Sequence, residues 1–323
     1  MKAIVYSGYG NADSLRLIEK EKPKPGKKEI LLKTEAVSLN ALDWRVLHGD
    51  PFLFRLSAGL FKPNYLGPGA DVAGVVEELG DQVNEFKVGD RVFGDILKSK
   101  MGGCAEYVCT PSESFCKTNE ALSSKEVCTI PIAGVTAIQA IRDQAKISRG
   151  SQVLINGATG SVGSLITQLC YYYKADVSAI CSAKNHELAK SLGAKTVYDY
   201  SNAGLDRIEG NFDFIIDNVG NLDASFFKRL LKNEGIGIIV GFKSFGHMLR
   251  TNLKSMLPSF GKRKLTVLSA KYKRSDLQDV QELFSKGDIS ANIQGVYDLE
   301  NTKEAMKILE SGHASGKLII QIA

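Results

Sequence analysis

Short apolar runs bounded by turn residues dominate the first third of the chain. The runs lie at 3–6, 29–33, 72–76 and 90–93. Segments rich in turn formers separate them, as at 22–26 and 87–90. Runs of this length and spacing are typical of β-strands. The pattern predicts a compact β-rich domain, interrupted between Ala41 and Gly59 by a less regular, partly helical stretch.

From about residue 123 the pattern alternates between helix and strand. It predicts helices over 124–130, 135–145 and 161–173, and strands at 152–156, 176–181, 195–198, 212–217, 235–240 and 264–269. Such alternation is typical of a parallel sheet wrapped by helices. The tail returns to the first pattern, with helices expected over 276–285 and 301–311 and strand-like runs at 295–297 and 317–321.

We therefore expect an α/β protein in which a doubly wound, Rossmann-type parallel sheet is inserted into a β-rich domain. The predicted boundaries are 1–122 for the first part of the β-rich domain, 123–270 for the nucleotide-binding domain, and 271–323 for the return segment. A length of 323 residues suits two domains.

The most informative motif joins an expected strand to an expected helix. It is a glycine turn with the spacing G-x-x-G-x-x-G, made of Gly157, Ala158, Thr159, Gly160, Ser161, Val162 and Gly163. Glycines permit a tight turn and let the backbone approach a pyrophosphate. The helix that follows presents free N–H groups and its positive dipole end to the anion. The turn therefore predicts a dinucleotide site.

The residues that follow the other expected strands support this prediction. Ligands of doubly wound sheets bind outside the carboxyl ends of the strands. The residues there are small, polar or aromatic, and include Ser182, Lys184, Asn185, Asp199, Tyr200, Asn218, Val219, Gly220 and Phe242.

The segment after the second strand predicts which dinucleotide binds. An NAD site carries an acid about 20 residues beyond the glycine turn. Ser182, Lys184 and Asn185 stand there instead, and they suit a 2′-phosphate better than a bare ribose. The cofactor expected is NADPH. Alternatively, Lys184 is an ordinary solvated lysine at a helix start.

Composition and charge bear on whether the protein binds nucleic acid, spans a membrane or is secreted. The net charge of +5 does not indicate nucleic acid, and no segment reaches the roughly 18 apolar residues of a membrane span. The N-terminus lacks the layout of a signal peptide. The six cysteines have no paired metal spacing, so we expect reduced thiols in a cytoplasmic protein.

Several further motifs carry a resemblance to a known family. They lie at 40–45, 69–76, 87–92, 103–107, 133–137 and 316–317. With the glycine turn, they resemble the medium-chain dehydrogenase/reductase superfamily, and more narrowly its zinc-free branch of NADPH quinone oxidoreductases and enone reductases. The resemblance implies a GroES-like catalytic domain beside the Rossmann domain, and a homodimer paired edge to edge. It also implies cofactor contacts at Thr136 and Lys317, besides the strand-end residues above.

The positions of zinc ligands in this superfamily determine the expected chemistry. Zinc alcohol dehydrogenases carry a Cys near the position of Asn40 and Gly-His-Glu at the position of Gly69-Ala70-Asp71, so we expect no metal site. Without a Lewis acid, an acceptor that spreads its own negative charge is favoured. Quinones and α,β-unsaturated carbonyls do so. The predicted partner is therefore a small molecule of this kind.

One or two hydrogen-bond donors can stabilise such an acceptor. The candidates are Asn40, Arg45 and Tyr65; by resemblance, Asn40 and Arg45 line the cleft beside the nicotinamide. Alternatively, Asn40 forms a turn, Arg45 lies on the surface and Tyr65 packs in the core. Asp43 and Asp71 are expected to hold local backbone.

The leading hypothesis is therefore an NADPH-dependent, zinc-independent reductase of quinones or conjugated carbonyls. Two alternatives remain. One is a metal-free alcohol dehydrogenase. The other is a non-catalytic sensor or structural protein that binds NADPH on the same scaffold.

Overall fold

The structure is a computed structural model of the whole chain, and it describes residues 1–323 except 51, 53–54, 202–204, 243, 257–259 and 323. The chain forms two compact units. The first combines Met1–Gly134 with Tyr272–Ala323, and the second is Val135–Lys271. Residues 123–134, which the pattern grouped with the nucleotide-binding domain, lie in the first unit.

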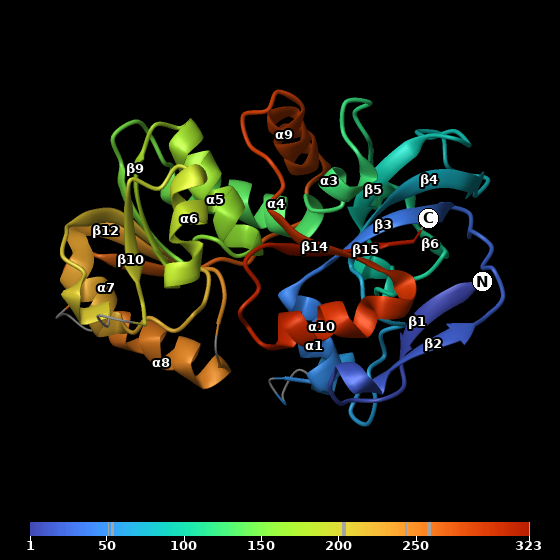
Figure 1. The fold of residues 1–323 in the computed structure, drawn as a ribbon, viewed down its shortest axis with the longest axis horizontal. Coiled ribbons are helices and arrows are strands. Elements are labelled where there is room, and N and C mark those ends of the chain that lie inside the picture. Colours follow the sequence, from blue (N-terminus) through green and yellow to red (C-terminus); the bar gives the residue numbers. More distant parts are fainter. Residues whose placement is uncertain (51, 53–54, 202–204, 243, 257–259, 323) are drawn as a thin grey trace. The chain divides into compact units, whose positions relative to one another are not determined.

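Parallel strands form the sheet of the second unit (Figure 1). They are β8 (Gln152–Asn156), β9 (Asp176–Cys181), β10 (Thr196–Asp199), β11 (Phe212–Asp217), β12 (Leu231–Ile239) and β13 (Lys264–Val267). Their order in the sheet is β10-β9-β8-β11-β12-β13. Counted along the unit this is the dinucleotide-binding order 3-2-1-4-5-6, with its switch point between β8 and β11.

Helices connect these strands. They are α5 (Ser161–Tyr172), α6 (His186–Ser191), α7 (Ala224–Leu230) and α8 (Phe245–Ser255). Val153, Leu154 and Ile155 of β8 are fully buried, as expected for a strand covered on both faces. The predicted helix over 135–145 is in fact two segments: α4 (Pro131–Ile138) and a π-helical stretch over Gln139–Ala145. Proline at a first helical position explains the earlier start.

The first unit is built on a mostly antiparallel sheet. Its strands are β3 (Glu29–Leu39), β4 (Asp71–Leu79), β5 (Arg91–Asp95), β6 (Tyr107–Pro111), β7 (Phe115–Lys117), β14 (Ile293–Asp298) and β15 (Lys317–Gln321). The order is β14-β15-β3-β4-β5-β7, with β6 also paired to β3. A separate hairpin pairs β1 (Lys2–Tyr6) with β2 (Leu15–Glu19).

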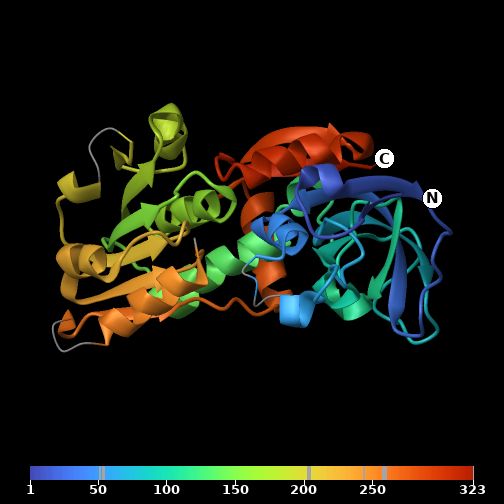
Figure 2. The same cartoon turned by 90° about the horizontal axis from the view of Figure 1, so that it is seen from below.

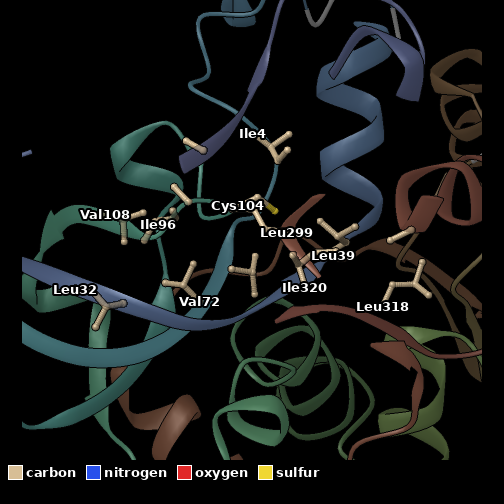
Figure 3. Close-up of a cluster of buried hydrophobic side chains, with 14 of the residues drawn as sticks. Ile4, Leu32, Leu39, Val72, Ile96, Cys104, Val108, Leu299, Leu318 and Ile320 are labelled. Atoms are coloured by element: carbon tan, nitrogen blue, oxygen red, sulfur yellow. The ribbon is translucent and has the colours of Figure 1, made fainter. Parts of the chain in front are cut away.

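The C-terminal segment completes this first unit. Strand β15 pairs with β3, and Figures 1 and 2 both show the red C-terminal elements beside the blue N-terminal ones. The helices are α1 (Ala41–His48), α2 (Arg55–Ala58), α3 (Ser124–Val127), α9 (Arg274–Ser285) and α10 (Thr302–Glu310). Side chains from both ends of the chain, such as Leu32, Val72 and Ile320, share one buried core (Figure 3). The predicted fold class is confirmed.

Candidate active site

The glycine turn between β8 and α5 has the geometry of a phosphate cradle. Gly157 has a φ of +72°, which L side chains rarely adopt. A Cβ at Gly163 would lie 2.0 Å from the Gly157 carbonyl oxygen. The N-cap of α5 is Gly160, so no side chain caps the first N–H groups of the helix. These N–H groups are therefore available to an anion.

Side chains at the glycine turn fit a phosphate as well. The Ser161 hydroxyl is buried and has no hydrogen-bond partner within the described part of the chain. Such a hydroxyl loses free energy unless a ligand or water satisfies it. Ala158 and Thr159 are buried, while Val162 is half-buried. The turn thus offers backbone donors and one hydroxyl, which suits a pyrophosphate.

The segment after β9 carries the side chains expected to meet a 2′-phosphate. Ser182 is half-buried at the N-cap of a 3-10 turn over Ala183–Asn185. Lys184 is exposed and Asn185 is half-buried. Tyr200 follows β10 and is 46% exposed. The structure therefore brings these residues to the carboxyl ends of two neighbouring strands.

The surroundings of two groups in this region were not foreseen from the sequence. Asp199 pairs in register with Cys181, so an acid lies beside the segment where the motif has none. Hydrogen bonds from Ser201 lower the pKa of Asp199, and its Oδ2 is buried without a partner among the described residues. His186 has a buried Nε2 without a partner in the same set. Only the pairing of β9 with β10 reveals that Asp199 lies beside the segment after β9.

A buried carboxylate shapes the loop after β11. Asp217 accepts hydrogen bonds from the N–H groups of Val219, Gly220 and Leu222, at 3.1, 2.8 and 3.0 Å. Its Oδ1 also accepts from Asn156 Nδ2 at 2.8 Å. Burial raises the pKa of Asp217, and these donors act in the opposite direction. Asp217 is therefore a positioning residue, and no motif of the sequence indicated it.

The predicted ligand residues of this loop are closely packed. Gly220 has a φ of +73°, and a Cβ there would lie 2.1 Å from Phe242 Cα. Asn218 donates to the carbonyl oxygen of Asn156, while its own Oδ1 is buried without a partner among the described residues. Val219 is 44% exposed. Thr136, on α4, is half-buried.

In the first unit, Asn40, Asp71 and Lys317 form a buried cluster. Lys317 Nζ lies 2.7 Å from Asn40 Oδ1 and 3.3 Å from Asp71 Oδ2. Asn40 Nδ2 donates to the same Asp71 oxygen at 3.0 Å. The Lys317 and Asp71 side chains are 3% and 0% exposed. Burial raises the pKa of Asp71, while Lys317 acts to lower it.

Asp43 fixes the backbone around this buried cluster. Its carboxylate accepts hydrogen bonds from the N–H groups of Asn40 and Gly69, both at 2.6 Å. Burial raises the pKa of Asp43 to about 7. Asp71 Oδ1 accepts from the Ile132 N–H at 3.1 Å. The expectation of a local backbone contact is confirmed for Asp43, which accepts from the N–H of Asn40. Asp71 instead holds the distant backbone of Ile132, 61 positions away, and its contact with Lys317 was not foreseen.

The other two candidate donors, Arg45 and Tyr65, make contacts of their own in the first unit. The Arg45 guanidinium lies 4.7 Å from the centre of the Trp44 ring and 3.7 Å from Asp50. Burial lowers the pKa of Arg45. Tyr65 is half-buried and packs against a small cluster that includes Ala70 and Met101.

Possible metal-ion sites can be assessed for the described residues. These residues contain no group of three or more His, Cys, Asp or Glu side chains arranged to hold a metal ion. Among them, too, no helix is both long and apolar enough to cross a bilayer.

A doubly wound sheet with a glycine turn, inserted into a β-rich domain, defines a nucleotide-dependent dehydrogenase or reductase. Comparison with known families agrees. The alcohol dehydrogenase GroES-like domain matches residues 26–121, and the zinc-binding dehydrogenase family matches residues 192–320.

Individual relatives narrow the class. The chloroplastic quinone-oxidoreductase QR1 of Triphysaria versicolor is 33% identical, over 99% of this chain and 98% of its own. The 2-methylene-furan-3-one reductase of Solanum lycopersicum is 30% identical, over 99% of this chain and 79% of its own. The solved quinone oxidoreductase of Coxiella burnetii is 30% identical and has a TM-score of 0.89, covering 100% of this chain and 99% of that one. The chain belongs to the medium-chain dehydrogenase/reductase superfamily, in its quinone oxidoreductase branch.

Proposed function

We propose that this protein uses NADPH to reduce quinones or α,β-unsaturated carbonyls without zinc. The observation that carries the proposal is full-length similarity to quinone oxidoreductases in a chain whose glycine turn is intact. When bound, the reduced dinucleotide supplies a hydride. The chain's own residues bind its phosphates, orient it and stabilise the charge that develops on the acceptor.

The choice of NADPH rests on the residues after β9 and β10. Ser182, Lys184, Asn185 and Tyr200 offer hydroxyls, an amide and a cation to a 2′-phosphate. The Asp199 carboxylate opposes a second anion and favours a free ribose hydroxyl. Because Lys184 is the only cation among these five residues, its charge decides the preference.

The decisive variant for cofactor choice is Lys184→Glu. A hydrogen bond to a charged group contributes about 1.5–3 kcal/mol, so the preference for NADPH should fall by about 10–100-fold. Dissociation constants for NADPH and NADH, from titration of protein fluorescence, measure it. Lys190→Glu is the matched control, since Lys190 is exposed on α6 and pairs with Glu187. Equal affinities in the parent protein would contradict the assignment.

The acceptor class is tested by turnover after exhaustive chelation. NADPH oxidation should proceed with 9,10-phenanthrenequinone and with a small enone. Loss of activity on chelation, restored by zinc, would refute zinc independence. Tight NADPH binding without turnover of any acceptor would favour the sensor alternative.

Two further assignments belong to this proposal. Among the described strands, β13 is an edge of the second unit's sheet, and an edge strand suits the pairing of a homodimer. Sedimentation at several concentrations tests this. The cytoplasmic location stays a prediction, and the Triphysaria relative is named as chloroplastic.

A further inference from the structure

The amide of Asn40 has no donor left for an acceptor. An asparagine amide carries two N–H groups. Those of Asn40 go to the Ser38 carbonyl oxygen at 3.2 Å and to Asp71 Oδ2 at 3.0 Å. What Asn40 retains is acceptor capacity on Oδ1, which already receives Lys317. An acceptor oxygen that gains negative charge needs a donor, so Asn40 does not stabilise it directly.

Lys317, in contrast, retains a donor. Its ammonium carries three N–H groups. Two are accounted for by Asn40 Oδ1 at 2.7 Å and Asp71 Oδ2 at 3.3 Å. The third has no partner within the described part of the chain. A cation that is 3% exposed, with one N–H unused, is the strongest donor of the buried cluster.

The alternative cation, Arg45, is already engaged. Its guanidinium stacks over Trp44 and faces Asp50. Lys317 is held in a different way, because the Asp71 carboxylate supplies its counter-charge. The Ile132 N–H and the Asn40 side-chain amide donate hydrogen bonds to Asp71 and hold that carboxylate in place. The ammonium is thus fixed before any substrate binds, which is the condition for effective electrostatic stabilisation.

We propose that Lys317 is a catalytic residue, whose ammonium donates a hydrogen bond to the acceptor oxygen, and that Asp71 and Asn40 are its positioning residues. This inference rests on the proposed function. In the step, the β-carbon of an enone gains the hydride, and the electron pair of its C=C bond shifts toward the carbonyl oxygen. Lys317 stabilises that oxygen, and a solvent proton completes the saturated ketone. The dinucleotide is oxidised and the enone reduced.

The test separates the charge of Lys317 from its structural role. Lys317→Met alone leaves Asp71 buried without its cation, so the variant to compare is Lys317→Met/Asp71→Asn, which removes both charges. We expect it to fold and still to bind NADPH, so that kcat can be compared at saturating NADPH. Its kcat for but-3-en-2-one should fall by about 10²–10³-fold, as on loss of an oxyanion donor. Lys317→Arg should recover part of this loss.

A second readout excludes a merely structural effect. The loss should be smaller with 9,10-phenanthrenequinone, because a more electron-poor acceptor needs less help from a donor. Lys307→Met, which removes an exposed lysine paired with Asp13, is the matched control and should keep full activity.

Three results would overturn the inference. They are parent-level kcat in the double variant, an equal loss with both acceptors, or a loss confined to NADPH affinity. The last would leave Lys317 as a cofactor contact and the proposed function intact. Absence of turnover by the parent protein would instead refute the proposed function itself, and this inference with it.

Discussion

The glycine turn of the second unit and the buried cluster of the first unit are assembled over very different lengths of chain. The glycine turn is one continuous stretch, Gly157–Gly163, whose donors are mainly backbone N–H groups. The buried cluster joins Asn40, which follows β3, to Asp71 at the start of β4 and Lys317 at the start of β15. One is specified by local conformation and the other by the register of a sheet.

This difference predicts which kind of substitution disrupts each site. A local turn fails when a side chain is added where no space exists. A cluster assembled from distant strands fails when one charge is removed, because the remaining charge is then buried alone. The two kinds of damage can be measured separately.

The largest effect is expected from Asp71→Ala. It leaves the Lys317 ammonium buried without its carboxylate, and breaking a buried pair in this way costs about 3–5 kcal/mol. The free energy of unfolding in urea measures it. The exposed pair of Lys307 and Asp13 provides the contrast, since Lys307→Ala should leave the unfolding midpoint unchanged. Equal effects of the two changes would show that the buried cluster does not stabilise the first unit.

A smaller effect is expected from Gly163→Ala. The added Cβ would lie 2.0 Å from the Gly157 carbonyl oxygen, so the turn must shift. Overpacking of this kind costs about 1–3 kcal/mol. We also expect weaker NADPH binding, by titration, because the first N–H groups of α5 move with the turn. Gly246→Ala on α8 is the control, since a Cβ there has no described atom within 4 Å. Unchanged NADPH affinity in Gly163→Ala would contradict the proposal that the glycine turn binds the phosphates of the dinucleotide.

The smallest effect, taken over a single pH unit, concerns pH. Burial raises the pKa of Asp95 to about 6 from the ordinary 3.8. The folded state therefore holds a proton that the unfolded state releases across this window, and stability falls as pH rises through it. The slope reaches about 1.4 kcal/mol per pH unit.

Asp95→Asn removes the titrating group, so comparison with the parent measures the contribution of Asp95 to the pH dependence. The Leu97 N–H donates to Asp95 at 3.1 Å, and the amide oxygen of the variant can still accept this hydrogen bond. The parent should lose stability relative to the variant between pH 4 and pH 6, as read from urea midpoints. A parent that gains stability relative to the variant over that range would show that the pKa of Asp95 is not raised.

The parts of the molecule that could be predicted from the sequence are those with local causes. Strands β8 and β11 have the predicted limits, because their apolar runs are long and bounded by turn residues. Strands β2 and β7 were not predicted, since β2 is mostly exposed and β7 has three residues. Ser124–Val127 carries a helical pattern, but it packs on β3 of the first unit.

The same distinction holds for the candidate site. The spacing of the glycines identifies the turn, because the constraint lies within a few residues. The pairing of Asp71 with Lys317 spans 246 positions and appears only when β15 is placed beside β3. Asp199 likewise approaches the segment after β9 through strand pairing, which no motif records.

The late position of β15 sets an order for biosynthesis. Val135–Lys271 is one continuous stretch, so its sheet can form as soon as it leaves the ribosome. The first unit is completed only when β15 emerges, since β15 lies between β14 and β3. Until then Asp71 lacks the Lys317 ammonium, and β3 lacks its pairing with β15. A nascent chain that is stalled before Lys317 emerges should therefore carry a protease-resistant middle and protease-sensitive N-terminal strands.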